Sequence, residues 1–259
     1  MDFHFNLALA EKYRSNSQKS RELTEDWVSR NLYCPVCGAA SVGRYENNHP
    51  VGDFFCDKCE SDFELKSKRS ATGKLSNKIS DGEYSTMISR ITSFRNPNFF
   101  FMTHKDWTVQ NLILIPNHFF TPSIIKKRSP LGPNARRAGW TGCNIDISGI
   151  PDSGKIFIIK DRVEVDHKLV IDGYAKTKAL RTADIKSRGW LLDILLCAER
   201  IPGSEFTLEQ MYGFEGILKQ KHPENNFVKD KIRQQLQLLR DKGFIEFLGN
   251  GNYRKIKLS

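Results

Sequence analysis

The chain has 259 residues, with 40 lysines and arginines against 30 aspartates and glutamates, a formal net charge of +10 and a pI near 9.3. This length allows one large domain or two modest ones, and the basic balance favours a polyanionic partner. No apolar run approaches the length of a transmembrane helix, and the first five residues lack the pattern of a signal peptide. We therefore expect a cytoplasmic protein with reduced thiols and no membrane partner.

Residues 5–33 are expected to be mostly helical, in two pieces. Leu7, Leu9, Ala10 and Tyr13 give the first piece an apolar side, and Thr24 is expected to cap a second helix that runs toward Leu32. These helices are interpreted as packing on a sheet, without a chemical role.

Two Cys-x-x-Cys pairs follow, Cys34 with Cys37 and Cys56 with Cys59, separated by eighteen residues. The spacing is typical of a structural zinc site, because each pair forms a tight knuckle that offers two thiolates to one tetrahedral ion. A redox role for the first pair is disfavoured because it would leave the second pair without a function. Two unrelated pairs of buried thiols are the remaining alternative.

A second set of chemical groups surrounds the second cysteine pair: Asp53, Glu64 and Lys66. Residues 51–55 and 62–67 alternate polar with apolar side chains, which predicts two strands, and the period of two puts Glu64 and Lys66 on one face. A hairpin turned by the cysteine knuckle would bring Asp53 beside Glu64. Two such carboxylates could hold Mg²⁺ for phosphodiester hydrolysis, with Lys66 positioning water or stabilising negative charge. A solvated edge strand is the alternative.

The following segments predict the rest of a mixed α/β core. Residues 67–78 are basic and polar and are expected to form a loop, either solvated or in contact with phosphate. Tyr84, Met87, Ile88 and Ile91 recur at helical spacing. Residues 98–103, 109–116 and 156–159 are short apolar runs typical of buried strands.

Residues 124–140 contain five cations and no acid, among prolines and glycines. Arg136 and Arg137 lie close to Trp140, and since cations hold phosphates and aromatic rings stack on bases, a DNA-binding loop is preferred over a solvated one. Residues 161–186 are interpreted as the end of the domain and a linker.

The C-terminal part predicts a winged helix-turn-helix. One helix covers residues 190–196, Thr207 caps a second, and Asn225 or Asn226 caps a third whose Val228, Ile232, Leu236 and Leu239 share one face. Residues 243–248 and 253–258 then form a hairpin.

The third of these helices is the candidate recognition helix. From residue 227 to 259 there are eight lysines and arginines against three acids. Lys229, Arg233, Gln234 and Gln237 face outward, which suits base edges in the major groove. A winged helix that contacts proteins instead is the alternative.

Taken in this order, the motif, the cysteines and the winged helix resemble the DpnI type of methyl-directed restriction endonuclease, within the PD-(D/E)xK nuclease superfamily. The resemblance extends from Phe3 to Lys257 and is carried by particular runs, residues 15–19, 23–28, 96–101, 135–146 and 231–237. Residues 160–181, 219–226 and the loop after Lys66 diverge from the family.

The resemblance implies a fold and an activity. Residues 1–183 would form the nuclease domain and residues 184–259 the winged-helix domain. Asp53, Glu64 and Lys66 would be catalytic with Mg²⁺, the four cysteines would hold structural Zn²⁺, and Trp140 would belong to a methyl-sensing pocket. The substrate would be double-stranded DNA carrying 6-methyladenine in GATC, cut by a monomer.

Two methyl-reading domains have a physical rationale. Burying one methyl group contributes about 0.8 kcal/mol, roughly a fourfold change in affinity, which is too little to separate methylated from unmethylated sites. Two readers that each sense both methyls of a palindrome would multiply these terms. Deleting residues 187–259 should then reduce the methyl preference. The competing hypothesis is a zinc-containing winged-helix transcriptional regulator without nuclease activity; a repair nuclease without methyl preference is a weaker one.

Overall fold

The computed structural model describes residues 1–47, 49–93, 96–182 and 184–256, and its largest element is a mixed sheet in the order β1-β2-β3-β5-β6-β9-β10. Only β3 and β5 pair in parallel, with Glu64 opposite Phe99 and Lys66 opposite Phe101. The chain crosses between these two strands through α2 (Tyr84–Ile91). The strands are β1 (Gly43–Arg44), β2 (Phe54–Phe55), β3 (Asp62–Arg69), β5 (Asn98–Lys105), β6 (Thr108–Ile115), β9 (Ile156–Lys160) and β10 (Val163–Glu164).

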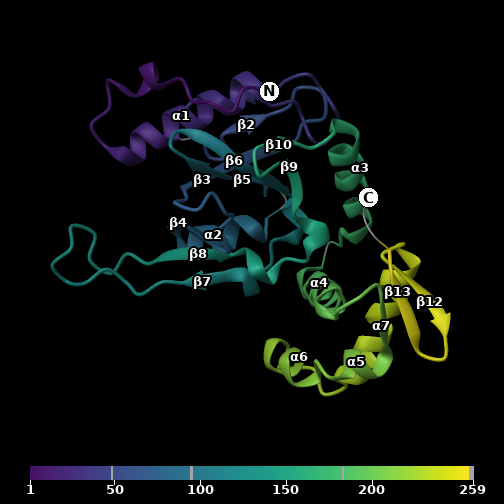
Figure 1. The fold of residues 1–259 in the computed structure, drawn as a ribbon. Coiled ribbons are helices and arrows are strands. Elements are labelled where there is room, and N and C mark those ends of the chain that lie inside the picture. Colours follow the sequence, from purple (N-terminus) through teal and green to yellow (C-terminus); the bar gives the residue numbers. More distant parts are fainter. Residues whose placement is uncertain (48, 94–95, 183, 257–259) are drawn as a thin grey trace.

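Each face of this sheet has its own core, because side chains alternate between the faces of a strand. Phe63, Phe100 and Met102 face one side, where α1 (Asn16–Asn31) contributes Trp27 and α3 (His167–Thr177) contributes Tyr174. Phe99, Phe101, Ile113 and Ile115 face the other side, which α2 covers. Figure 1 shows α1 and α2 on opposite sides of the sheet. The mixed α/β core is confirmed.

The N-terminal helices differ from the expectation. A short 3₁₀ turn, η1 (Leu7–Ala10), precedes a single helix α1, and Thr24 lies inside it rather than at its start. The Thr24 hydroxyl donates back to the carbonyls of Ser20 and Arg21. Thr24 therefore bonds back to the preceding turn, as threonines inside helices do, and the capping prediction was wrong.

Two further segments were not expected. Strand β3 continues to Arg69, so the loop after Lys66 begins later than predicted. The region interpreted as domain end and linker contains α3, with Asp166 as its N-cap accepting from the backbone N–H groups of Lys168 and Leu169.

A small antiparallel sheet, β4-β8-β7, lies beside α2. It consists of β4 (Lys78–Glu83), β7 (Ile125–Lys127) and β8 (Gly142–Asp146). Residues 128–141, which we call the arm, connect β7 to β8 and project away from the body in Figure 1. Residues 124–140 were expected to form a loop, but Ile125–Lys127 form β7, and Ile124 and Ile125 are buried; the rest of the segment lies in the arm.

The C-terminal part has the predicted helix-turn-helix and wing. The capping box of Thr207 with Gln210 opens α5, as expected. Helix α7 starts after Phe227 without a side-chain cap, although the Asn225 side chain accepts from the Phe227 N–H. Residues 257 and 258 of the expected last strand lie outside the described residues. The elements are α4 (Ile185–Arg200), β11 (Glu205–Thr207), α5 (Leu208–Tyr212), α6 (Glu215–Lys221), α7 (Val228–Asp241), β12 (Ile245–Gly249) and β13 (Asn252–Lys255).

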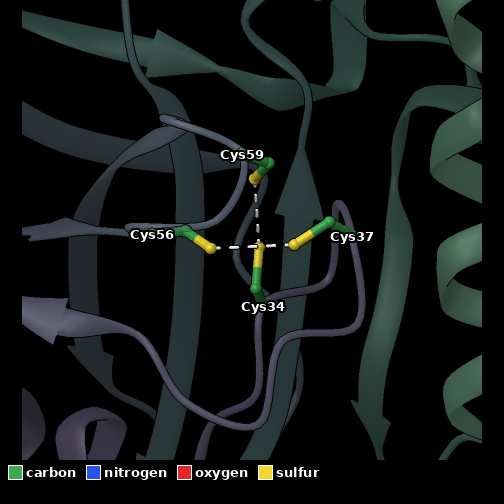
Figure 2. Close-up of side chains that lie close together, drawn as sticks. All are labelled: Cys34, Cys37, Cys56 and Cys59. Carbon is green, nitrogen blue, oxygen red and sulfur yellow. Dashed lines mark hydrogen bonds between the residues drawn. The ribbon is translucent and has the colours of Figure 1, made fainter.

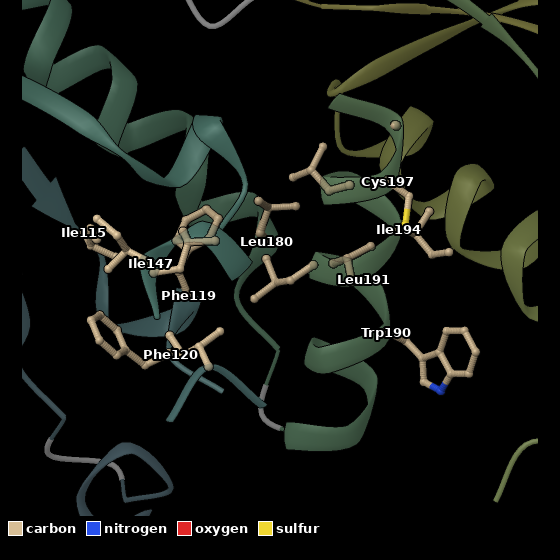
Figure 3. Close-up of a cluster of buried hydrophobic side chains, with 14 of the residues drawn as sticks. Ile115, Phe119, Phe120, Ile147, Leu180, Trp190, Leu191, Ile194 and Cys197 are labelled. Atoms are coloured by element: carbon tan, nitrogen blue, oxygen red, sulfur yellow. The ribbon is translucent and has the colours of Figure 1, made fainter. Parts of the chain in front are cut away.

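Helix α4 joins the two halves. Leu191 and Ile194 belong to the same buried cluster as Phe119, Phe120 and Leu180, as Figure 3 shows. The winged-helix half therefore packs on the sheet through an apolar surface. No helix in the described part of the chain is long and apolar enough to cross a membrane.

Candidate active site and metal centre

The four cysteines converge on one point, as Figure 2 shows. Their Sγ atoms all lie within 4.8 Å of one another. The Sγ atoms of Cys34 and Cys59 are 3.6 Å apart, and those of Cys37 and Cys56 are 3.7 Å apart. Tetrahedral Zn–S bonds of about 2.3 Å place sulfur atoms about 3.8 Å apart, so this geometry is compatible with zinc.

The two knuckles have the same backbone plan. Gly38, φ 75°, and Glu60, φ 56°, each follow the second cysteine of a pair and return an N–H to the carbonyl of the first. Burial raises the pKa of Cys34, and N–H groups of Val36 and Cys37 partly oppose that rise. The donor set and the repeated turn fit a structural zinc ion, which would fix the hairpin between β2 and β3.

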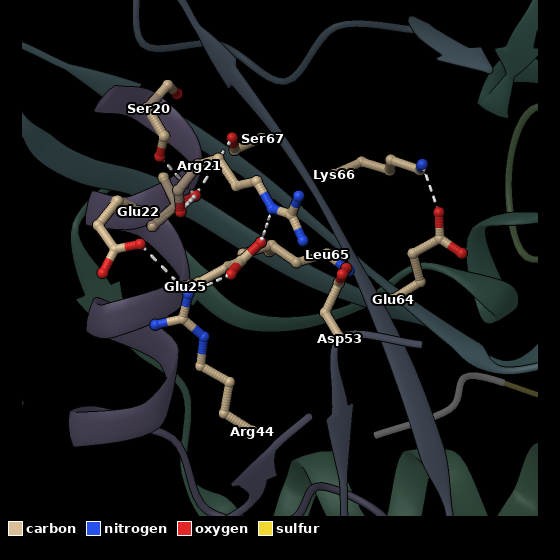
Figure 4. Close-up of polar contacts among 11 residues, drawn as sticks. Ser20, Arg21, Glu22, Glu25, Arg44, Asp53, Glu64, Leu65, Lys66 and Ser67 are labelled. Carbon is tan, nitrogen blue, oxygen red and sulfur yellow. Dashed lines mark hydrogen bonds and ion pairs between the residues drawn. The ribbon is translucent and has the colours of Figure 1, made fainter. Parts of the chain in front are cut away.

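That hairpin places Asp53 beside β3. The Asp53 N–H donates to the Phe63 carbonyl at 2.9 Å, and its Oδ2 accepts from the Leu65 N–H at 2.8 Å. A Cβ at Gly52 would lie 2.7 Å from the Phe63 carbonyl oxygen, so the close approach of the two strands requires glycine there. Asp53 and Glu64 thus both line one cleft beside β3, with Asp53 held at the Leu65 N–H (Figure 4).

Glu64 and Lys66 point to the same side of β3 and form an ion pair. The Lys66 Nζ also contacts Asp81 Oδ1 at 2.6 Å, and Arg90 from α2 pairs with Glu64. Burial alone would lower the pKa of Lys66, but Glu64 and Asp81 outweigh it and raise the pKa above its ordinary value. Lys66 is therefore a cation held between two carboxylates.

Helix α1 forms the opposite wall. Glu25 is only 4% exposed and accepts from Arg21 and Arg44, each at 2.6 Å. Together with Asp53 and Glu64, the α1 side chains line a cleft of about 560 Å³. This cleft is polar and open, as a site for a phosphodiester must be.

Two properties of Asp53 bear on cation binding. Burial raises the pKa of Asp53, nearby Glu25 raises it further, and the Leu65 N–H bond acts in the opposite direction. Two carboxylates that line one open polar cleft suit Mg²⁺, which prefers oxygen ligands and retains several waters. A bound cation would offset the repulsion between Asp53 and Glu25 and would replace the contacts of Glu64 with Lys66 and Arg90.

The arm carries the first set of predicted DNA contacts. Arg136 and Arg137 are exposed, and the Arg137 guanidinium lies 4.9 Å from the centre of the half-buried Trp140 ring. The Trp140 carbonyl accepts from the Leu131 N–H across the hairpin at 2.9 Å. The arm therefore presents cations and an aromatic ring together.

The second set lies on α7. Lys229, Arg233, Gln234 and Gln237 are all exposed. Arg233 donates to the Tyr212 hydroxyl at 3.0 Å and pairs with Asp230. Figure 1 shows α7 and the arm in different parts of the molecule, so these two sets do not form one surface.

Several polar residues of the site were not identified from the sequence, among them Asp81, Arg90 and Glu25. Asp81 and Arg90 come from β4 and α2, and their contact with β3 depends on how the crossover folds. Glu25 had a local signal, an acid inside the apolar surface of an amphipathic segment, which favours a buried, paired carboxylate. The sequence pattern does not show which residues pair with Glu25.

The family comparison agrees with this arrangement. The DpnI family, described as the Dam-replacing family, matches residues 1–183, and the Dam-replacing HTH domain matches residues 186–255. The first match contains the cysteines and the cleft, and the second contains α7. The chain therefore belongs to the DpnI family of methyl-directed, restriction-type nucleases.

Proposed function

We propose that this protein is a Mg²⁺-dependent type II endonuclease that cleaves double-stranded DNA at GATC sites containing 6-methyladenine. The observation that carries the proposal is the cleft in which Asp53, Glu64 and Lys66 meet, in a chain of this family. A DNA-binding regulator has no use for two carboxylates in a cleft that admits phosphate, since acids repel DNA.

In this proposal, Asp53 and Glu64 hold the catalytic cation. Magnesium bound there would polarise the scissile phosphate and lower the pKa of a water molecule. The Leu65 N–H fixes the orientation of the Asp53 carboxylate. Lys66, released from Glu64 but still bound to Asp81, supplies a positive charge where negative charge develops on the phosphate.

The zinc site has a structural role in the proposal. Cys34, Cys37, Cys56 and Cys59 anchor the turn that joins Asp53 to β3, without contacting the substrate. Zinc thus supports the cleavage chemistry by holding the strand on which the acids lie.

Recognition is divided between two surfaces. Arg136, Arg137 and Trp140 contact DNA from the arm, with Trp140 against the adenine methyl. Lys229, Arg233, Gln234 and Gln237 contact DNA from α7. Because one buried methyl contributes only about 0.8 kcal/mol, reading by both surfaces increases the discrimination.

The proposal divides the chain into a nuclease domain, residues 1–183, and a winged-helix DNA-binding domain, residues 184–259. We propose that a cytoplasmic monomer carries both. The ranges of the family matches support this division. The apolar contacts of α4 with the sheet give the two domains a fixed joint.

The test is digestion of one plasmid prepared with and without adenine methylation at GATC, by the wild type and by Asp53→Asn in Mg²⁺. The proposal expects fragments from methylated plasmid with the wild type alone. Binding of methylated DNA without cleavage by the wild type would favour the transcriptional regulator. Equal cleavage of both plasmids would favour a nuclease without methyl preference.

A further inference from the structure

A second polar cleft, of about 380 Å³, lies where the nuclease sheet meets α4. It is bounded by the end of α2, the start of β5, the end of β6 and the chain that leads into α4. Its polar lining includes Thr92, Asn96, Asn117, His118, Arg181 and Arg188. None of the described side chains that line it is acidic.

Two guanidinium groups in this cleft lack a counter-ion. Neither Arg181 nor Arg188 forms an ion pair within the described ranges. Arg188 is half-buried, and its Nε is buried without a hydrogen-bond acceptor among the described residues. Among the same residues, Nη2 has only the Phe120 carbonyl, at 3.4 Å. A guanidinium withdrawn from water without a compensating anion is costly, so its retention points to a ligand.

The neighbouring groups do not neutralise these cations. Arg181 donates to the Tyr174 hydroxyl at 2.8 Å and to His118 Nδ1 at 3.4 Å. Burial and the nearby arginines lower the pKa of His118 to about 3, so the ring is neutral. The charge of Asp184 opposes the lowering of the Arg188 pKa by burial. The Asp184 carboxylate nevertheless caps α4 by accepting from the Ser187 N–H, and it does not line the cleft.

We propose that this cleft binds a phosphate group. Guanidinium groups match phosphate oxygens in charge and geometry, and a cleft of this size admits one phosphate with attached sugar or water. If the proposed endonuclease function holds, the DNA backbone is the nearest source. A free phosphate or mononucleotide shares the same chemistry.

The position of the cleft connects it to the proposed active site. Ile91 lines the cleft, and the preceding residue, Arg90, pairs with Glu64 on β3. Helix α4 begins at the same place, so a phosphate bound there would contact the joint between the two domains. DNA held in this cleft would fix the winged helix relative to the catalytic strand.

The experiment compares wild type, Arg188→Gln and the control Lys176→Gln, which removes an exposed cation of α3. Arg181→Gln provides a second cleft variant. Near-ultraviolet circular dichroism checks that each protein is folded. The probes are inorganic phosphate, measured as the rise in Tm over chloride at equal ionic strength, and a methylated GATC duplex, measured as the salt dependence of affinity without added Mg²⁺.

For a backbone phosphate, the slope of log affinity against log salt should fall by about 0.9 in each arginine variant and much less in Lys176→Gln. A slope that stays constant, with phosphate stabilising wild type but not Arg188→Gln, would assign the cleft to a free phosphate. No stabilisation by phosphate together with unchanged slopes would overturn the proposal. Because binding is measured without cleavage, failure of the endonuclease function would leave these results interpretable.

Discussion

Two hairpins carry the groups proposed for catalysis and for DNA contact, and they are built in opposite ways. Cys56 and Cys59 of the turn between β2 and β3 converge with Cys34 and Cys37 on one point, and the acids beside this turn lie in a cleft lined by ion pairs. The arm between β7 and β8 projects from a small sheet, with Arg136 and Arg137 exposed. Phosphodiester chemistry needs groups held in a fixed geometry, whereas a reading element must reach its target.

We therefore expect substitutions in the two hairpins to impair different properties of the protein. Changes at the cysteine hairpin should abolish cleavage of every substrate. Changes at the arm should leave the chemistry intact and alter how tightly DNA is bound or which DNA is chosen. The following four predictions run from the largest expected effect to the smallest.

Removing the zinc site should have the largest effect. Cys59→Ser leaves three thiolates, so the knuckles lose their ion, the Asp53 strand loses its anchor, and cleavage should fall below detection. Zinc content by mass spectrometry and Tm measure the loss. Cys143→Ala, at a cysteine outside the cluster, should retain both zinc and activity. Full cleavage by zinc-free protein would contradict the structural role.

Asp53→Asn should reduce the cleavage rate by on the order of 10³-fold or more, because a metal ligand contributes several kcal/mol to transition-state stabilisation. The raised pKa of Asp53 means that folding disfavours its charged form, which costs stability above that pKa. Metal-free Asp53→Asn should therefore have an equal or higher Tm than the wild type at neutral pH.

The control for this prediction is Asp57→Asn, an exposed carboxylate between the second pair of cysteines. Its cleavage rate should match the wild type. A lowered Tm in Asp53→Asn, with proportional loss of activity, would show that Asp53 is a structural group rather than a metal ligand.

Asp81→Asn should act mainly on the metal requirement. Without Asp81, Lys66 pairs more strongly with Glu64 and competes with Mg²⁺ for that carboxylate. A loss of about 1 kcal/mol corresponds to roughly a fivefold increase in the Mg²⁺ concentration for half-maximal cleavage. Titration with Mg²⁺ measures this shift, and Asp81→Glu should restore it. An unchanged titration in Asp81→Asn would exclude a positioning role.

Substitutions in the arm should cause the smallest change in the cleavage rate and should change the preference for methylated DNA. Trp140→Ala should reduce the ratio of methylated to unmethylated cleavage by about fourfold, the value of one buried methyl, with little effect on chemistry. Arg137→Gln is the matched comparison: it should weaken binding to both DNAs equally. Competition cleavage of paired duplexes measures both. An unchanged ratio in Trp140→Ala would remove Trp140 from methyl recognition.

The packing of α4 on Phe119, Phe120 and Leu180 determines how the contribution of the winged helix should be tested. Deleting residues 187–259 would expose the apolar surface around Phe119, Phe120 and Leu180 to water. The truncated nuclease would lose stability as well as methyl preference. Substitutions at exposed residues of α7, such as Gln237, separate recognition from folding.

Local patterns predicted much of the fold. The cysteine spacing and the alternation around Asp53 predicted the hairpin, and the apolar periodicity predicted β5, β6 and the core face of α7. These features repeat within a few residues, so they are visible in the sequence. The predicted helix start at Thr24 was wrong. Thr24 is a residue type common at helix N-caps but lies inside α1, which begins after Ser15, a residue whose side chain forms no capping hydrogen bond.

The site was less predictable wherever distant segments meet. Asp81 and Arg90 contact β3 only because the crossover through β4 and α2 folds back on it. The cleft around Arg181 and Arg188 combines four separate segments. Such contacts depend on the tertiary packing, for which a single sequence carries no local signal.

We propose that Asp53 and its neighbours perform methyl-dependent cleavage. The most direct test of this proposal is single-turnover cleavage of two synthetic duplexes that differ only in 6-methyladenine at GATC, with the wild type and Asp53→Asn in Mg²⁺. The account predicts rapid cleavage of the methylated duplex by the wild type and, with Asp53→Asn, binding without cleavage. Undiminished cleavage by Asp53→Asn would contradict the account.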